Sequence, residues 1–197
     1  MAETGVIDIF VMLGPRPHDV IRQFTGVTGR APLPQRFATA YHQCRWNYKD
    51  EADIFAVNEN FNTYDIPMDV LWLDIEYTDS KKYFTWDKSA FPNSIEMQRK
   101  IAEHGRKMVT IIDPHIKREA GYAVHDAALA QSLYVRDNNN AKEYEGFCWP
   151  GPSSWLDYLN PTVRDWWAQQ FAYDRFVGSS PTVYIWNDMN EVCTAFF

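Results

Sequence analysis

Apolar runs alternate with segments of helical spacing along most of the chain. Residues 6–13 are almost entirely apolar and predict a strand, which the following Gly and Pro close. Apolar side chains at helical spacing predict a helix over 18–28, and Gly29 stops it. Residues 30–34 hold two prolines, which are incompatible with a helix interior, so this segment is expected to be a linker.

Beyond Pro34 the pattern becomes a regular alternation of strand and helix. Strands that are nearly uniformly apolar and separated by helices predict an α/β fold with a parallel sheet covered on both faces. Four strand–helix units amount to the first half of a TIM (β/α)8 barrel, strands 1–4, and a complete doubly wound sheet fits the same alternation. The predicted strands are 37–42, 68–75, 107–112 and 183–186, and the predicted helices are 49–60, 94–104, 124–131 and 161–176.

Composition narrows the possible partners. The 197 residues suffice for one ordinary domain with a core. The formal net charge is -7, and no run of Lys or Arg provides the electrostatic footprint of a nucleic-acid binder. The longest apolar stretches fall far below the roughly 20 residues of a membrane helix, so we expect neither nucleic acid nor membrane as a partner. An aromatic content of 16% favours ring-stacking ligands such as sugars.

Carboxylates follow three of the predicted strands. Asp74 and Glu76 come at the end of one, Asp113 follows the next, and Asp188 and Glu191 follow the last. A single Asp after a strand is usually a helix cap or a turn residue. Side chains that converge from several strand ends are how barrel sites are assembled, so the repetition predicts a site at this edge.

The spacing of these carboxylates suggests different roles. Asp74 and Glu76 lie two apart, so in an extended strand both side chains would point to one side and share a pocket. Asp188 lies between Asn187 and Asn190, whose amides can donate hydrogen bonds around it. That arrangement favours an oriented, ionised nucleophile.

Other chemistries have weaker support. Asp113 and His115 offer two metal ligands one residue apart, but no second His or Cys pair lies nearby, so neither a metal nor a cofactor is expected. The Gly-x-Ser-x-Gly pattern of a serine nucleophile is absent. Trp46 and Trp149 are either core residues or a platform for a pyranose ring.

Four segments of the sequence resemble motifs of a known family. Residues 186–191 (Trp-Asn-Asp-Met-Asn-Glu) are similar to the nucleophile motif of glycoside hydrolase family 31. Residues 41–48, 72–76 and 113–116 resemble its other barrel motifs, in the same order. Within the family, residues 83–86 and 145–151 resemble enzymes that trim glucose from N-glycans in the endoplasmic reticulum.

The resemblance implies a domain plan and an activity. Residues 1–34 would be the end of an N-terminal β-sandwich and a connecting helix, 35–191 a partial (β/α)8 catalytic barrel, and 192–197 a divergent tail. The implied activity is that of a retaining exo-α-glucosidase, which releases terminal α-1,3-linked glucose from an oligosaccharide or N-glycan. A regulatory β subunit and the lumen of the endoplasmic reticulum are implied for the full-length family member.

The resemblance also implies residue roles. Asp188 would be the nucleophile and Asp74 would bind glucose hydroxyls. A retaining enzyme needs a second carboxyl about 5–5.5 Å from the nucleophile, and in this family it follows a later strand, so no residue here is assigned to it. We therefore expect a truncated chain, and an inactive half-barrel with at most sugar binding is the alternative. The residues implied to line the pocket are Trp46, Ile75, Asp113, Trp149 and Trp186.

Overall fold

The computed structural model describes residues 5–139 and 141–190, and the chain divides into two compact units, residues 1–36 and 37–197. Glu191 and the predicted divergent tail, 192–197, lie outside the described residues.

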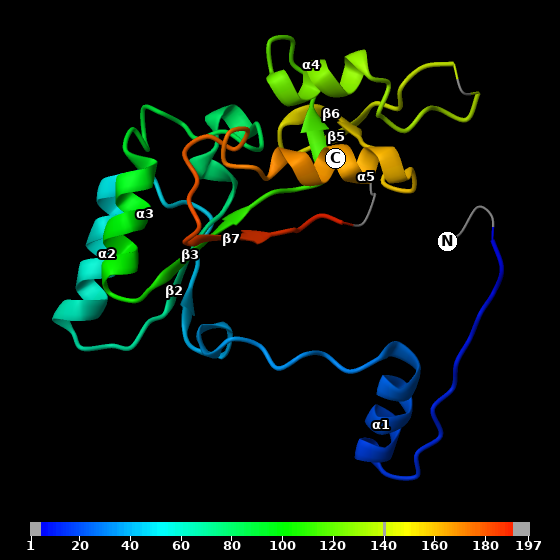
Figure 1. The fold of residues 1–197 in the computed structure, drawn as a ribbon, viewed down its shortest axis with the longest axis horizontal. Helices are drawn as coiled ribbons and strands as arrows, with labels where there is room; N and C mark the ends of the chain where they lie inside the picture. The colour runs from blue at the N-terminus through cyan, green and yellow to red at the C-terminus, as the bar shows by residue number, and fades with distance from the viewer. Residues whose placement is uncertain (1–4, 140, 191–197) are drawn as a thin grey trace. The chain divides into compact units, whose positions relative to one another are not determined.

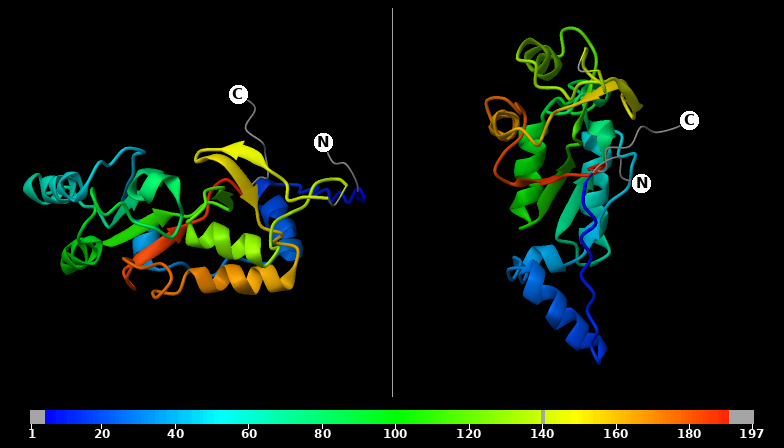
Figure 2. Two further views of the ribbon diagram at one scale, coloured as in Figure 1. Left: turned by 90° about the horizontal axis from the view of Figure 1, so that it is seen from above. Right: turned by 90° about the vertical axis from the view of Figure 1, so that its right-hand side faces the viewer.

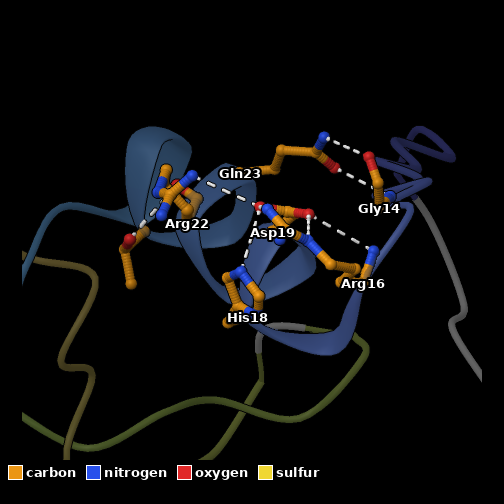
Figure 3. Close-up of polar contacts among 7 residues, drawn as sticks. Gly14, Arg16, His18, Asp19, Arg22 and Gln23 are labelled. Atoms are coloured by element: carbon orange, nitrogen blue, oxygen red, sulfur yellow. Dashed lines mark hydrogen bonds and ion pairs between the residues drawn. The ribbon is translucent and has the colours of Figure 1, made fainter.

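The first unit is built around one helix, α1 (Pro17–Thr28), as predicted. Pro17 occupies the first helical position, where a missing N–H costs nothing. Asp19 ties the first turn together, since its carboxylate accepts a hydrogen bond from the Arg16 side chain at 2.9 Å and pairs with Arg22 at 3.3 Å (Figure 3). The side-chain amide of Gln23 makes two hydrogen bonds to the backbone of Gly14, which fixes the chain's entry into the helix.

The strand predicted over 6–13 is wrong. Residues 5–14 have no regular secondary structure, and Val6, Ile7 and Leu13 are 93%, 90% and 85% exposed. An apolar run rich in Val, Ile and Phe has strand propensity, but a strand exists only where a neighbour pairs with its N–H and C=O groups. No strand of the described residues pairs with this segment.

The second unit contains a four-stranded parallel sheet, so the predicted α/β class and parallel sheet are confirmed. Its order is β1-β2-β3-β7, each strand lying beside its predecessor in the alternation (Figure 1). The strands are β1 (His42–Gln43), β2 (Val70–Leu73), β3 (Lys107–Ile111) and β7 (Val183–Trp186). Consecutive neighbours of one direction are the pattern that repeated β–α units produce.

Helices connect these strands and supply the core. α2 (Glu51–Thr63) and α3 (Ser94–Glu103) lie side by side (Figure 1). α2 begins at Asp50, whose carboxylate accepts from the backbone N–H of Asp53 at 2.8 Å. α4 (Ala123–Ala130) and α5 (Pro161–Gln170) follow. Fully buried side chains from sheet and helices interlock as one core, among them Ile54, Leu71, Leu73, Met97, Ile101 and Met108.

A second sheet occupies the long connection between β3 and β7. β4 (His115–Lys117), β5 (Gly146–Cys148) and β6 (Gly151–Trp155) form an antiparallel sheet in the order β4-β6-β5. β5 and β6 make a hairpin, seen from two further sides in Figure 2. The sequence pattern did not predict this sheet, because its pairing joins β4 to residues more than thirty positions away.

Several predicted boundaries are also wrong. Residues 36–39 form a 3-10 helix, and β1 is only two residues long, where a strand over 37–42 was expected. The strand predicted to reach residue 75 ends at Leu73 and turns into a 3-10 helix, Ile75–Tyr77. In the part of the chain that the structure describes, no helix has the length and apolarity to cross a membrane.

Candidate functional site

The carboxylates predicted to converge lie at one edge of the parallel sheet. Asp74 directly follows β2, Asp113 lies two residues beyond β3, and Asp188 lies two beyond β7. Leu73 pairs with Thr110, and Ile111 pairs with Trp186, so the three strands end level with one another. The carboxyl ends of parallel strands are where barrel sites are built, and this register brings the three acids to that edge.

Asp74 sits where β2 turns into the 3-10 helix. Its Oδ1 accepts a hydrogen bond from the backbone N–H of Ile75 at 2.7 Å, so the side chain caps the turn. Burial raises the pKa of the Asp74 carboxyl, and the negative charges of Asp188 and Glu76 raise it further. The helical turn also removes the premise that Asp74 and Glu76 lie along one face of an extended strand.

Asp188 occupies the irregular segment after β7, and its side chain is partly buried. Its charge acts on Asp74, which places the two carboxylates within electrostatic reach of each other. The following residue, Met189, has a φ of 53°, so its backbone is in the left-handed region. The side-chain amide of Asn190 donates to the backbone carbonyl of Asn187 at 3.1 Å. This asparagine therefore braces the loop around Asp188, whereas the sequence led us to expect it to donate to the carboxylate.

Two indole rings lie together beside the acidic edge. Trp46 follows β1 and is 48% exposed, and Trp149, in the turn between β5 and β6, is 37% exposed. The rings meet edge to face with centroids 5.4 Å apart. The Trp46 indole N–H donates to Glu76 Oε1 at 3.0 Å. A pair of exposed, oriented indoles beside carboxylates offers apolar planes and hydrogen-bond acceptors together, which is what a sugar ring requires.

Trp186 ends β7 and is partly buried. Its ring packs edge to face on Trp72 of β2 at 5.3 Å between centroids, and the Trp72 indole N–H donates to His42 Nδ1 at 2.8 Å. The other His42 nitrogen, Nε2, donates to the carbonyl of Phe37 at 3.0 Å, which fixes the imidazole tautomer. These contacts hold the Trp186 ring at the sheet edge.

Ile75 and Asp113 differ from the other predicted site residues because they are buried. Ile75 is 1% exposed and Asp113 is 0% exposed. The Asp113 carboxylate accepts a hydrogen bond from the Tyr83 hydroxyl, and His115 Nε2 lies 3.1 Å from the same hydroxyl oxygen. In this conformation both side chains are enclosed by the protein.

Three residues of this region were not singled out from sequence for these roles. Glu76 orients Trp46, and Tyr83 and His115 enclose Asp113. Each of these hydrogen bonds joins residues about thirty positions apart, so no local sequence pattern predicts it. Among the described residues, no group of three His, Cys, Asp or Glu side chains is placed to hold a metal ion.

The fold and the site together define a class of protein. A repeating β–α sheet whose strand ends gather carboxylates beside a pair of exposed indoles is typical of barrel enzymes that act on carbohydrates. A family model described as the glycosyl hydrolases family 31 TIM-barrel domain matches residues 31–196. The chain belongs to glycoside hydrolase family 31.

Relatives and solved structures agree with this assignment. A rice protein named probable glucan 1,3-alpha-glucosidase is 59% identical over 191 residues, covering 97% of this chain and 21% of its own. The crystal structure of a glucosidase II alpha subunit bound to alpha3-Glc2 matches 93% of this chain and 20% of its own, at 47% identity and a TM-score of 0.87. An ER glucosidase II heterodimer of catalytic subunit and regulatory-subunit binding domain matches 90% and 19%, at 48% identity and a TM-score of 0.84.

The chain spans about a fifth of the length of the curated relatives that it matches. The match to the family model establishes the family of this chain.

Proposed function

We propose that this chain supplies the first four strands of the (β/α)8 barrel of a retaining exo-α-glucosidase. The observation that carries the proposal is the meeting of Asp188 and Asp74 at the ends of β7 and β2, where the charge of one raises the pKa of the other. Such a pair suits a nucleophile and a hydroxyl-binding carboxylate in one subsite. Membership of the family and the parallel strand order support the same assignment.

In the proposed reaction the Asp188 carboxylate attacks the anomeric carbon of a terminal glucose. The glycosidic bond breaks as a second carboxylic acid protonates its oxygen, and a covalent glucosyl ester forms on Asp188. Water then attacks the anomeric carbon, gives a proton to the second carboxylate and frees Asp188, with retention of configuration. We assign no described residue to the second carboxyl, and expect it from a later strand of a complete barrel, as the family resemblance implies.

The remaining site residues would shape the pocket. Asp74 would accept hydrogen bonds from glucose hydroxyls, and Trp186 would pack against the ring. Trp46 and Trp149 would line the entrance, with Trp149 near the leaving sugar. Their exposure and their edge-to-face contact support this placement.

We propose α-1,3-linked glucose on an N-glycan as the substrate. The rice relative is named for a 1,3-alpha-glucosidase activity, and a matching glucosidase II structure holds alpha3-Glc2. A regulatory β subunit is the proposed partner and the endoplasmic reticulum lumen the proposed location, because a matching ER glucosidase II structure is a heterodimer with a regulatory subunit.

The test is hydrolysis of an aryl α-glucoside by the protein expressed at its native length. We expect Asp188→Asn to lower kcat by about a thousandfold or more, since the nucleophile is lost. Asp165→Asn, an exposed carboxylate on α5, is the matched control and should leave kcat unchanged. A fluorinated α-glucosyl fluoride should esterify Asp188, and peptide mass spectrometry would locate the adduct. Full activity in Asp188→Asn would overturn the assignment.

The second candidate is an inactive half-barrel that binds sugar. The exposed indole pair favours it, because such a platform can bind a pyranose without any catalytic group. A native-length protein that shows glucose-dependent changes in tryptophan fluorescence without turnover would support this alternative. Turnover abolished by Asp188→Asn would exclude it.

A further inference from the structure

A buried hydrogen-bonded chain lies behind the proposed pocket, at the junction of the two sheets. The Tyr83 hydroxyl donates to Asp113 Oδ2. His115 Nε2 lies 3.1 Å from the Tyr83 hydroxyl oxygen. Because the hydroxyl proton points to the carboxylate, the imidazole must donate from Nε2, so the direction of the chain is His115 to Tyr83 to Asp113. All three side chains are 0% exposed.

The imidazole of His115 is neutral. Burial lowers the pKa of His115 to about 4, so it carries no charge at neutral pH. His115 Nε2 is 3.8 Å from Asp113 Oδ2, which is beyond direct hydrogen bonding, and the hydroxyl of Tyr83 stands between them. Within the described residues His115 Nδ1 has no hydrogen-bond partner. The ring is held through Nε2 and by its edge-to-face contact with Tyr83 at 5.3 Å.

The hydrogen bonds among Tyr83, Asp113 and His115 secure the link from the parallel sheet to the hairpin. Asp113 follows β3 and His115 begins β4, with only Pro114 between them. The Pro114 carbonyl accepts from the Tyr158 hydroxyl at 3.0 Å, so all three linking residues are anchored. The loop that carries Tyr83 is itself fixed, because its backbone carbonyl accepts from the Tyr122 hydroxyl at 2.8 Å.

The hairpin beyond this link presents Trp149. His115 pairs with Trp155 across β4 and β6, and β6 pairs with β5, so the register of β4 sets the position of the turn. Cys148, the residue before Trp149, is buried and acts electrostatically on the Tyr83 hydroxyl. The three hydrogen-bonded residues therefore contact the base of the hairpin through His115 and Trp155, and lie within electrostatic reach of Cys148 near its tip.

We propose that Tyr83, Asp113 and His115 are positioning residues that fix the Trp149 hairpin and so set the leaving-sugar side of the pocket. The inference rests on the proposed function, and it assigns Asp113 a role behind the pocket instead of direct contact with glucose. Complete burial of Asp113 supports that role, since a direct ligand would need an exposed oxygen.

The test compares two substrates on the native-length protein: an α-1,3-linked glucose disaccharide, and α-glucosyl fluoride, which has no leaving sugar. Tyr83→Phe keeps the ring and removes the hydroxyl. We expect kcat/KM to fall about tenfold or more on the disaccharide, the usual effect of losing a hydrogen bond to a charged group. On the fluoride the loss should stay below about threefold.

Tyr134→Phe is the matched control. Its hydroxyl also lies 2.8 Å from a buried histidine, His125, in place of the contacts that the Tyr83 hydroxyl makes with Asp113 and His115. The ratio of kcat/KM for the two substrates should stay at the wild-type value in this variant. Trp149→Ala should reproduce the selective loss, and combining it with Tyr83→Phe should add little, because both changes remove the same placement.

A second measurement does not depend on turnover. With 5-fluorotryptophan incorporated, the Trp149 resonance, assigned by Trp149→Phe, should shift or broaden in Tyr83→Phe and stay in place in Tyr134→Phe. An unmoved resonance would overturn the positioning role, as would equal losses on both substrates, which would mean that Asp113 acts on glucose itself. A wild-type protein inactive on both substrates would overturn the proposed function instead, and the resonance would still decide whether the hairpin is positioned.

Discussion

The indole N–H of Trp46 donates to Glu76 Oε1 at 3.0 Å, across thirty positions of the chain. Trp46 follows β1 and Glu76 lies in the turn after β2, so one hydrogen bond ties two strand ends together. Glu76 also raises the pKa of Asp74, after burial and Asp188 as causes. The same carboxylate thus orients an exposed ring and adjusts a neighbouring acid.

Glu76→Gln separates these two effects. The amide oxygen can still accept from Trp46, while the charge that acts on Asp74 is gone. We expect the pKa of Asp74 to fall, and therefore the acidic limb of the pH profile of kcat/KM to move to lower pH. Glu59→Gln on α2 should leave the limb where it is. An unmoved limb in Glu76→Gln would contradict either this electrostatic coupling or the need for an ionised Asp74.

Asp74→Asn should stabilise the protein while it impairs catalysis. The folded-state pKa of Asp74 lies above its unfolded value, so the folded state holds this proton more tightly and stability falls as pH rises through that window. Asn keeps the acceptor for the Ile75 N–H and removes the charge. The expected result is a higher Tm than wild type at pH 7, with the difference shrinking toward pH 4. Equal Tm values at pH 7 and pH 4 would contradict it.

His115 should make the protein sensitive to mild acid. Its folded pKa of about 4 lies below the usual 6.5, so the unfolded state binds the proton first and stability is lost as pH falls from about 6.5 to 4. The full loss is on the order of 3 kcal/mol. His115→Phe should be less stable than wild type at pH 7 and should show a flatter decline in urea unfolding between pH 7 and pH 4. A parallel decline would contradict the prediction.

Gly178→Ala should destabilise the protein strongly. Gly178 has a φ of 99°, and a Cβ there would lie 2.7 Å from Trp86 Cδ1 and 2.9 Å from Ser94 Oγ. Its carbonyl also accepts from Ser94 Oγ and Gln98 Nε2, at 2.9 and 2.6 Å, so the backbone has little freedom to move away. We expect a loss of about 2–4 kcal/mol in the free energy of unfolding, from strain and overpacking together.

Gly105→Ala is the control for backbone strain alone. Gly105 also has a positive φ, 74°, but no heavy atom lies within 4 Å of its added Cβ. The Gly105→Ala change should lower the free energy of unfolding by about 1 kcal/mol. Equal losses in the two variants would show that the contacts with Trp86 and Ser94 contribute nothing.

Among the described residues of the second unit, the four helices of eight residues or more and the parallel direction of the strands followed from the sequence, because their signals are local. Asp50 and Asn160 cap α2 and α5, and Pro161 opens α5 at the first helical position. Uniformly apolar strands between helices predicted a parallel sheet covered on both faces. The meeting of Asp74 and Asp188 at one edge then followed from strand direction.

What the sequence by itself determined is therefore the α/β alternation, the acidic strand ends and the family motifs. The tertiary structure alone decided that residues 6–13 are not a strand, that 146–155 form a hairpin on β4, and that Asp113 is enclosed by Tyr83 and His115. Pairing, burial and hydrogen bonding between segments depend on partners tens of residues away, and periodicity within one segment does not encode which partner it meets.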